Sequence, residues 1–94
     1  MRKKKYVIDA ADFTSNRQAH DVMKKVFRGC EYYGNNLDAL HDVLTSIMKD
    51  VNITVRNLEK SKEQIGTYAD TLRRVFCDSA EENEHITLVF EEEE

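Results

Sequence analysis

The chain has 94 residues, of which 40% are hydrophobic and 34% are charged, and its formal net charge is −4. This composition is typical of a folded, soluble domain and argues against disorder. The chain is too short for two halves that each bury a core, so we expect a single domain over residues 1–94. No apolar run approaches the roughly 20 residues that span a bilayer.

The hydrophobic pattern predicts strands and helices that alternate along the chain. Short runs of β-branched and apolar residues predict three strands, at residues 6–8, 51–55 and 85–90. Apolar residues at helical spacing predict four helices, at about residues 15–28, 36–47, 57–64 and 68–80. Because helices separate the strands, we expect an α/β fold in which a small three-stranded parallel sheet is packed with about four helices.

The start of the chain and its cysteines indicate a cytoplasmic protein. The basic residues 2–5 are followed by Asp9 and Asp12, which interrupt the apolar stretch that a secretory signal needs. Cys30 and Cys77 lack the Cys-x-x-Cys spacing of many metal and redox sites, so we expect two free thiols.

Lys and Arg are absent from two windows of the sequence, Gly29–Met48 and Val75–Glu94, and both windows contain acidic residues. If the two windows fold onto the same side, they form one anionic face that attracts basic partners and repels nucleic acid. We interpret glutamates 91–94 as a solvated tail that adds to this field. The basic residues 2–5 are interpreted as a solvated cap on the first strand, and the alternative is a contact with nucleic acid or a membrane surface.

The predicted helix that begins near Asn36 has an apolar side and an acidic side. Its apolar stripe consists of Leu37, Leu40, Leu44 and Ile47. Asp38 and Asp42 lie one turn apart on another side, and no Lys or Arg is placed to pair with Asp42 along the helix. Two like charges at this spacing cost a few tenths of a kcal/mol, which the cationic site of a partner would offset. The alternative is an ordinary solvated helix surface.

The run from Tyr32 to Leu44 has the pattern Tyr-Tyr-Gly-x-Asn-Leu-Asp-Ala-Leu-x-Asp-x-Leu. This loop-to-helix pattern resembles the signature of the barstar family, the intracellular inhibitors of barnase-type ribonucleases. The order of elements over nearly the whole chain is also similar to that family. The resemblance implies that the loop and the second helix plug the active-site cleft of a nuclease. It also implies that an aspartate matching Asp42 takes the place of a substrate phosphate there.

The resemblance further implies which residues contact the partner. An acidic contact on the last helix matches Asp78, with Glu82 one turn later. The candidate partner-binding residues are Tyr32, Asn36, Leu37, Asp38, Ala39, His41, Asp42, Val75, Asp78 and Glu82. Position 41 departs from the family, whose members often carry tryptophan there. His41 is either a plain helix-surface residue or an interface residue that makes binding sensitive to pH near the pKa of about 6.5 that is ordinary for histidine.

We therefore predict a protein that is not an enzyme and that binds a small basic ribonuclease as a monomer, in a 1:1 complex, without contacting nucleic acid or membrane. The sequence has no Gly-rich phosphate loop, no His-Glu-x-x-His motif and no Gly-x-Ser-x-Gly elbow. Its three histidines lack metal-ligand spacing, so we expect neither a metal nor another cofactor. One alternative is a module of the same fold that neutralises or regulates a different basic toxin or protein. An RNA-binding domain is a further alternative, but it conflicts with an acidic face.

Overall fold

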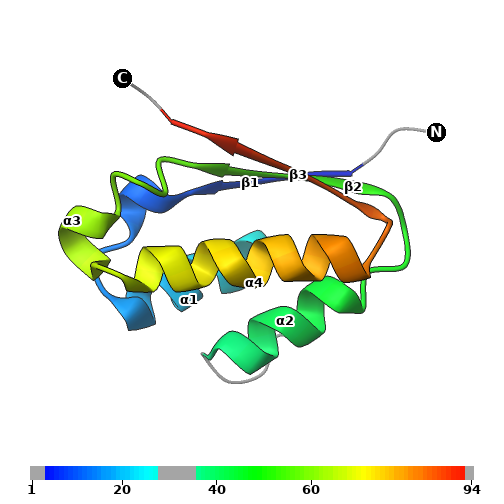
Figure 1. Cartoon of the computed structure of the whole chain (residues 1–94), viewed down its shortest axis with the longest axis horizontal. Coiled ribbons are helices and arrows are strands. Elements are labelled where there is room, and N and C mark those ends of the chain that lie inside the picture. The colour runs from blue at the N-terminus through cyan, green and yellow to red at the C-terminus, as the bar shows by residue number, and fades with distance from the viewer. Residues whose placement is uncertain (1–3, 28–35, 93–94) are drawn as a thin grey trace.

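The computed structural model describes residues 4–27 and 36–92, and it confirms the α/β fold expected from the sequence. Its elements, in chain order, are β1 (Lys4–Asp9), the 3-10 helix η1 (Ala10–Asp12), α1 (Asn16–Val26), α2 (Leu37–Thr45), β2 (Val51–Arg56), α3 (Lys62–Ile65), α4 (Tyr68–Glu82) and β3 (Ile86–Glu91). Within the described residues, three parallel strands form one sheet, accompanied by four α-helices (Figure 1).

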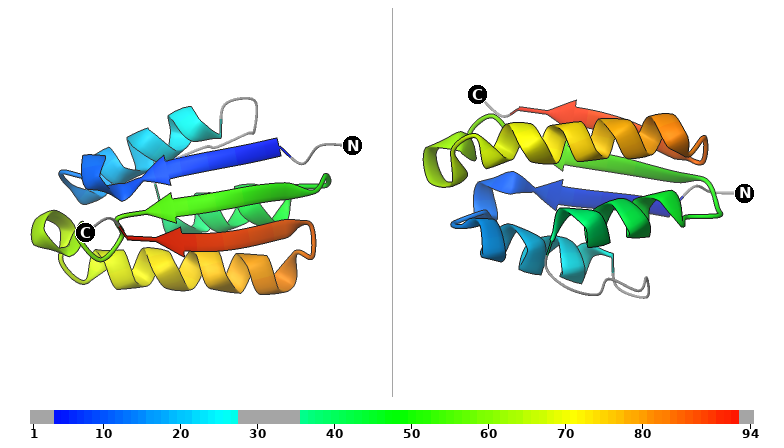
Figure 2. Two further views of the ribbon diagram at one scale, coloured as in Figure 1. Left: turned by 90° about the horizontal axis from the view of Figure 1, so that it is seen from above. Right: turned by 60° about the horizontal axis from the view of Figure 1, so that its bottom comes forward.

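The three longer helices lie on the same face of the sheet (Figures 1 and 2). The strand order is β1-β2-β3, so both crossovers step to the next strand in the same direction. Because crossovers between parallel strands are almost always right-handed, two steps in one direction place the helices on one face. Helix α2 is the farthest of the three from the sheet and lies between α1 and α4 when viewed from above (Figure 2).

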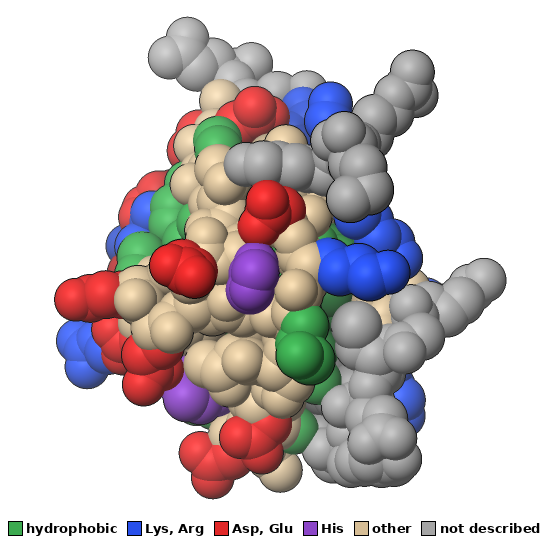
Figure 3. Space-filling view, turned by 90° about the vertical axis from the view of Figure 1, so that its right-hand side faces the viewer, with side chains coloured by type: hydrophobic (Ala, Val, Ile, Leu, Met, Phe, Trp, Pro, Cys, Tyr) green, Lys and Arg blue, Asp and Glu red, His purple; other side chains and the backbone are tan. Residues whose placement is uncertain are grey.

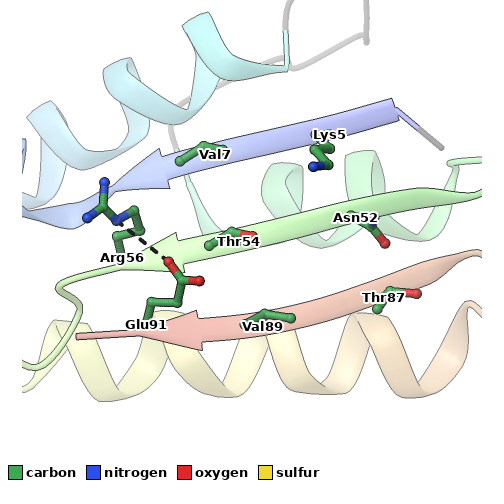
Figure 4. A pocket seen from close by; sticks show the side chains of 8 residues that line it. All are labelled: Lys5, Val7, Asn52, Thr54, Arg56, Thr87, Val89 and Glu91. Atoms are coloured by element: carbon green, nitrogen blue, oxygen red, sulfur yellow. Dashed lines mark ion pairs between the residues drawn. The ribbon is translucent and has the colours of Figure 1, made fainter. Parts of the chain in front are cut away.

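The opposite face of the sheet is open among the described residues. Residues along the strands alternate between the buried and the exposed side, as expected for a sheet that is covered on one side. The open face is lined by Lys5, Val7, Asn52, Thr54, Arg56, Thr87, Val89 and Glu91 (Figure 4). Most of these side chains are polar or charged, which explains why a parallel sheet can leave this face in water instead of burying both faces.

A single buried cluster joins the covered face of the sheet to the helices. Its largest fully buried side chains are Phe13, Phe27, Phe76, Ile8, Met23, Leu40, Leu44, Ile53, Leu58, Leu72, His20 and Val55. Two of these leucines, Leu40 and Leu44, belong to α2, so this helix is attached to the core although it is the farthest of the three from the sheet. The apolar stripe predicted for the second helix is therefore the side that is buried.

Two predicted helices differ from the observed ones. The helix predicted at residues 57–64 is wrong in its first half, where the chain forms a turn ahead of α3. Asn57 has a φ of 63°, and its Nδ2 donates to Asp9 Oδ1 at 3.0 Å, so tertiary contact turns the chain there. The second helix ends two residues before Ile47, which nevertheless packs against the core.

The described part of the acidic tail lies away from the ends of α2 and α4. Strand β3 runs back along the molecule from the end of α4, so Glu91 and Glu92 lie at the opposite end (Figure 1). There Glu92 Oε1 accepts the backbone N–H of Glu59 at 2.8 Å. The predicted tail is wrong in its first residue, because Glu91 is the last residue of β3 and its Oε1 lies 3.7 Å from Arg56 Nε.

Two further expectations concern the cysteines and a membrane span. Cys77 is a free, exposed thiol on α4, as predicted, whereas Cys30 lies outside the described residues. In the ranges that the structure describes, no helix combines the length and apolar character needed to cross a bilayer.

His20 is a buried histidine where α1 meets the start of α4. Its side chain is only 1% exposed, and its Nε2 is hydrogen-bonded to the Tyr68 hydroxyl at 2.6 Å. Burial lowers the pKa of His20 below its ordinary value of 6.5 and outweighs the nearby carboxylate of Asp21, which raises it. As the pH falls below this ordinary value, the unfolded chain therefore takes up a proton more readily than the folded protein does.

We expect the free energy of unfolding to decrease as the pH falls below about 6.5, because protonation of this histidine then favours the unfolded chain. One proton contributes at most about 1.4 kcal/mol per pH unit to this slope. Urea unfolding at several pH values between about 5 and 7.5 measures it. The His20→Gln variant should show a shallower slope, and an unchanged slope would exclude His20 as its cause.

Candidate partner-binding face

Asn36 determines where α2 begins. Its Oδ1 accepts the backbone N–H of Ala39 at 2.8 Å, and its own backbone is extended, with φ −142° and ψ 170°. An asparagine at this position satisfies one of the N–H groups that the start of a helix leaves without a partner. Asp38 follows in the first turn, where the helix dipole stabilises a carboxylate. Local chemistry thus orients the start of the helix that carries both aspartates.

Asn36→Ala is expected to lower the free energy of unfolding by about 1 kcal/mol and to weaken partner binding, because α2 loses its cap. Ser15 offers a matched control, since its Oγ caps α1 by accepting the N–H of Gln18 at 3.0 Å. Ser15→Ala should cost similar stability and leave binding unchanged. Urea unfolding and binding measurements on both variants test this. Equal losses of binding would show that Asn36 has no particular role at the interface.

Helix α2 has a buried side and an exposed, acidic side. Leu40 and Leu44 are fully buried, and Val43 is 4% exposed. Asp38 and Asp42 are exposed, and within the described part of the chain neither carboxylate takes part in a hydrogen bond or an ion pair. Since like charges one turn apart repel each other, a cationic group brought close to both would be attracted.

Helix α2 packs against α4, and the two helices run in the same direction (Figure 1). His41 Nε2 is hydrogen-bonded to Glu82 Oε2 at 2.5 Å, which joins the exposed surfaces of the two helices. Beside this pair is a hollow of about 340 Å³, lined by His41, Asp78, Glu81 and Glu82. Asp38 and Asp42 are within about 100° of His41 around the helix axis, so all three residues lie on the same broad side of α2.

These six residues form what we call the acidic face: Asp38, His41 and Asp42 of α2, and Asp78, Glu81 and Glu82 of α4. The two sequence windows that supply them contain no Lys or Arg, so packing of α2 against α4 concentrates negative charge. Figure 3 views the end of the molecule where both helices finish; acidic side chains and histidines lie on its middle and left parts, with Lys or Arg side chains to the right and at the left edge. Such a surface attracts basic partners over distances of about a Debye length.

A second pair of a histidine and a carboxylate lies where strands β2 and β3 begin. His85 Nδ1 is 2.9 Å from Asp50 Oδ1, where β3 and β2 begin. It does not line the hollow, so we do not include it in the acidic face.

The site residues predicted from the sequence lie in different surroundings in the structure. Those that it brings together around the hollow are His41, Asp78 and Glu82, whereas Asp38 and Asp42 are exposed on α2 and do not line it. Leu37, Ala39 and Val75 are partly buried and pack against the core, so only part of each side chain is exposed to a partner. Asn36 is exposed at the start of α2, and Tyr32 lies outside the described residues.

Two residues of the site were missed by the sequence analysis. Glu81 lines the hollow, but the run of acidic residues at the end of α4 did not distinguish it. Asn83 is buried directly after α4, and its Nδ2 donates to the carbonyl oxygens of Leu44 and Ile47. These acceptors are 39 and 36 residues away in the sequence, so no local pattern could reveal the contact.

Comparisons with known proteins agree with this arrangement. The family model described as "Barstar (barnase inhibitor)" matches residues 4–91, which include all three strands and both helices of the acidic face. The chain belongs to the barstar family. Another similar protein is the "Putative ribonuclease inhibitor YrdF" of Bacillus subtilis (strain 168). It is 36% identical over 80 residues, which cover 84% of this chain and 88% of that protein.

The barstar resemblance inferred from the loop and second helix is thereby confirmed, and it extends over most of the chain. The α/β fold, with three parallel strands in one sheet and four helices among the described residues, is consistent with it. In the described ranges of this barstar-family protein, no group of three or more His, Cys, Asp or Glu residues could hold a metal ion.

Proposed function

We propose that this protein inhibits a small, basic, barnase-type ribonuclease by covering its active-site cleft with the acidic face. The observation that carries the proposal is the exposed pair Asp38 and Asp42, which have no intramolecular partner among the described residues and lie on a capped helix beside the acidic end of α4. The description of the family as barnase inhibitors and the name of the B. subtilis relative support the same role.

The chemistry of a ribonuclease cleft suits these carboxylates. The cleft must hold an anionic backbone, so it gathers Arg, Lys and His side chains. A carboxylate on a rigid helix accepts charge-assisted hydrogen bonds from such groups, and from Arg it can accept two at once. One pair about 4 Å apart has a Coulomb energy of roughly 4 kcal/mol at an effective dielectric constant of 20, before the cost of desolvation is subtracted.

The residues of the face are assigned different parts in this proposal. Asp42, in the middle of α2, occupies the position of a substrate phosphate, and Asp38 flanks it. The first turn of α2, residues 36–39, together with Tyr32 and Val75, contributes shape and contact area. Asp78 and Glu82 supply a second acidic contact from α4. A partner cation that reaches Glu82 must share this carboxylate with His41, its present hydrogen-bond partner.

The distribution of charge favours a protein partner over a nucleic acid. Phosphate backbones are repelled by a cluster of carboxylates, whereas a basic protein is attracted and associates faster at low ionic strength. Blocking a cleft requires no chemistry from the inhibitor, so we propose a protein that is not an enzyme. We further propose that it acts in the cytoplasm, as a monomer that forms a 1:1 complex.

Titration into a panel of small barnase-type ribonucleases, with RNA cleavage as the readout, tests the proposal. We expect the activity of at least one of them to fall linearly and to reach its minimum at a 1:1 ratio. Size-exclusion chromatography with light scattering should give one inhibitor per nuclease. If no ribonuclease is inhibited, the proposal is wrong, and the alternative of a different basic toxin or protein would be pursued by affinity capture.

A further inference from the structure

Asn83 connects the end of α2 to the junction between α4 and β3. Its side-chain Nδ2 donates to Leu44 O at 3.0 Å and to Ile47 O at 2.9 Å. Its Oδ1 accepts the backbone N–H of His85 at 3.0 Å. The residue is only 7% exposed, so these hydrogen bonds compete little with water. One amide group thus links α2 to the segment that begins β3.

The carbonyl groups that Asn83 binds belong to Leu44, in the last turn of α2, and to Ile47, two residues after its end, a region where the i→i−4 bonding of a helix stops. The last turn of α2 contains no Lys or Arg that could bind them. The hydrogen bond between His41 and Glu82 also joins α2 to α4, but both side chains are more than one-third exposed. Among the described residues, Asn83 is thus a buried polar connection between α2 and the end of α4, and it lies next to Glu82.

We propose that Asn83 is the positioning residue of the acidic face, because its amide holds α2 against α4 and so fixes Asp42 relative to Asp78 and Glu82. Three carboxylates on two helices present one rigid surface only if the helices cannot shift against each other. Preorganisation of this kind lowers the cost of ordering an interface when a partner binds. The statement about binding rests on the proposed inhibitor function, whereas the statement about α2 does not.

Two variants of Asn83 separate its hydrogen bonds from its volume. Asn83→Ala removes all three side-chain bonds. Asn83→Asp keeps the acceptor for His85 but turns an oxygen toward the two carbonyl groups. Because Asn83 has an extended backbone with φ −127° and ψ 102°, neither substitution strains the chain. Val55→Ala is the control. Val55 is fully buried near the end of β2, so truncation of its side chain destabilises the protein but leaves the hydrogen bonds between Asn83 and α2 in place.

Hydrogen–deuterium exchange on the free protein tests whether Asn83 holds α2 against α4. We expect the amides of α2 to exchange roughly ten- to a hundredfold faster in both Asn83 variants than in Val55→Ala, after correction for global stability. The amides of β1 and β2 should not differ after the same correction. If the α2 amides exchange no faster than in the control, Asn83 does not hold α2 and the proposal is overturned. This measurement needs no partner, so it remains decisive if no ribonuclease is inhibited.

A double-mutant cycle with Asp42→Ala, measured on an inhibited ribonuclease, tests whether Asn83 positions Asp42 for binding. If Asn83 acts by positioning Asp42, Asn83→Ala should raise the dissociation rate about tenfold or more in the wild-type background and less than about threefold in the Asp42→Ala background. Val55→Ala should have the same small effect in both backgrounds. If Asn83→Ala has equal effects in both backgrounds, its contribution is general stability, and the positioning role is wrong.

Discussion

Asp42→Ala is expected to raise the dissociation rate of the ribonuclease complex by roughly 30- to 5,000-fold, which corresponds to about 2–5 kcal/mol. In the proposed complex the Asp42 carboxylate is buried against cations of the cleft, and truncation leaves those cations without their partner. The association rate should change far less, because the other carboxylates of the acidic face still attract the nuclease. Surface plasmon resonance or stopped-flow measurements give both rate constants.

Glu92→Ala is the charge-matched control for this experiment. It removes the same unit of charge from the opposite end of the molecule, where Glu92 contacts the backbone of Glu59. We expect its dissociation rate to equal that of the wild type and any change to be confined to the association rate and its dependence on salt. Similar dissociation rates for Asp42→Ala and Glu92→Ala would contradict a central role for Asp42.

Leu44→Ala is expected to lower the free energy of unfolding by about 2–5 kcal/mol. Leu44 is fully buried where α2 meets the core, and truncation of its side chain leaves a cavity that the surrounding residues fill only in part. Domains of this size are commonly stable by about 5–15 kcal/mol, so the loss is a large share of the total. Urea unfolding followed by circular dichroism measures it.

Met48→Ala provides the comparison, because Met48 follows α2 closely in sequence but is 85% exposed. Its effect should stay within about 0.5 kcal/mol. The two variants remove comparable apolar side chains, so the difference between their free energies of unfolding reports the effect of burial. If Leu44→Ala costs less than about 1 kcal/mol, α2 contributes little to the core, and its rigidity would have to come from polar contacts such as that of Asn83.

Elements whose signals are local were predictable from the sequence. The caps of α1 and α2 are examples, because Ser15 and Asn36 each bind a backbone N–H only three residues ahead. The buried side of α2 follows from the spacing of Leu40 and Leu44, which places both on one side of a helix. The prediction at residues 57–64 was wrong in its first half because the turn at Asn57 involves Asp9, 48 residues away.

The sequence by itself determined that α2 is a capped, amphipathic helix with two exposed aspartates, since each of these features depends on residues within one or two turns. Only the tertiary structure decided which other acidic residues lie beside them. It places Asp78 and Glu82 next to α2, whereas the direction of β3 carries Glu92 to the far end. Strand β3 has six residues and extends about 20 Å, so residues just before it and just after it lie at opposite ends of the molecule. The contact of Asn83 with α2 likewise depends on how the helices pack, which local periodicity does not encode.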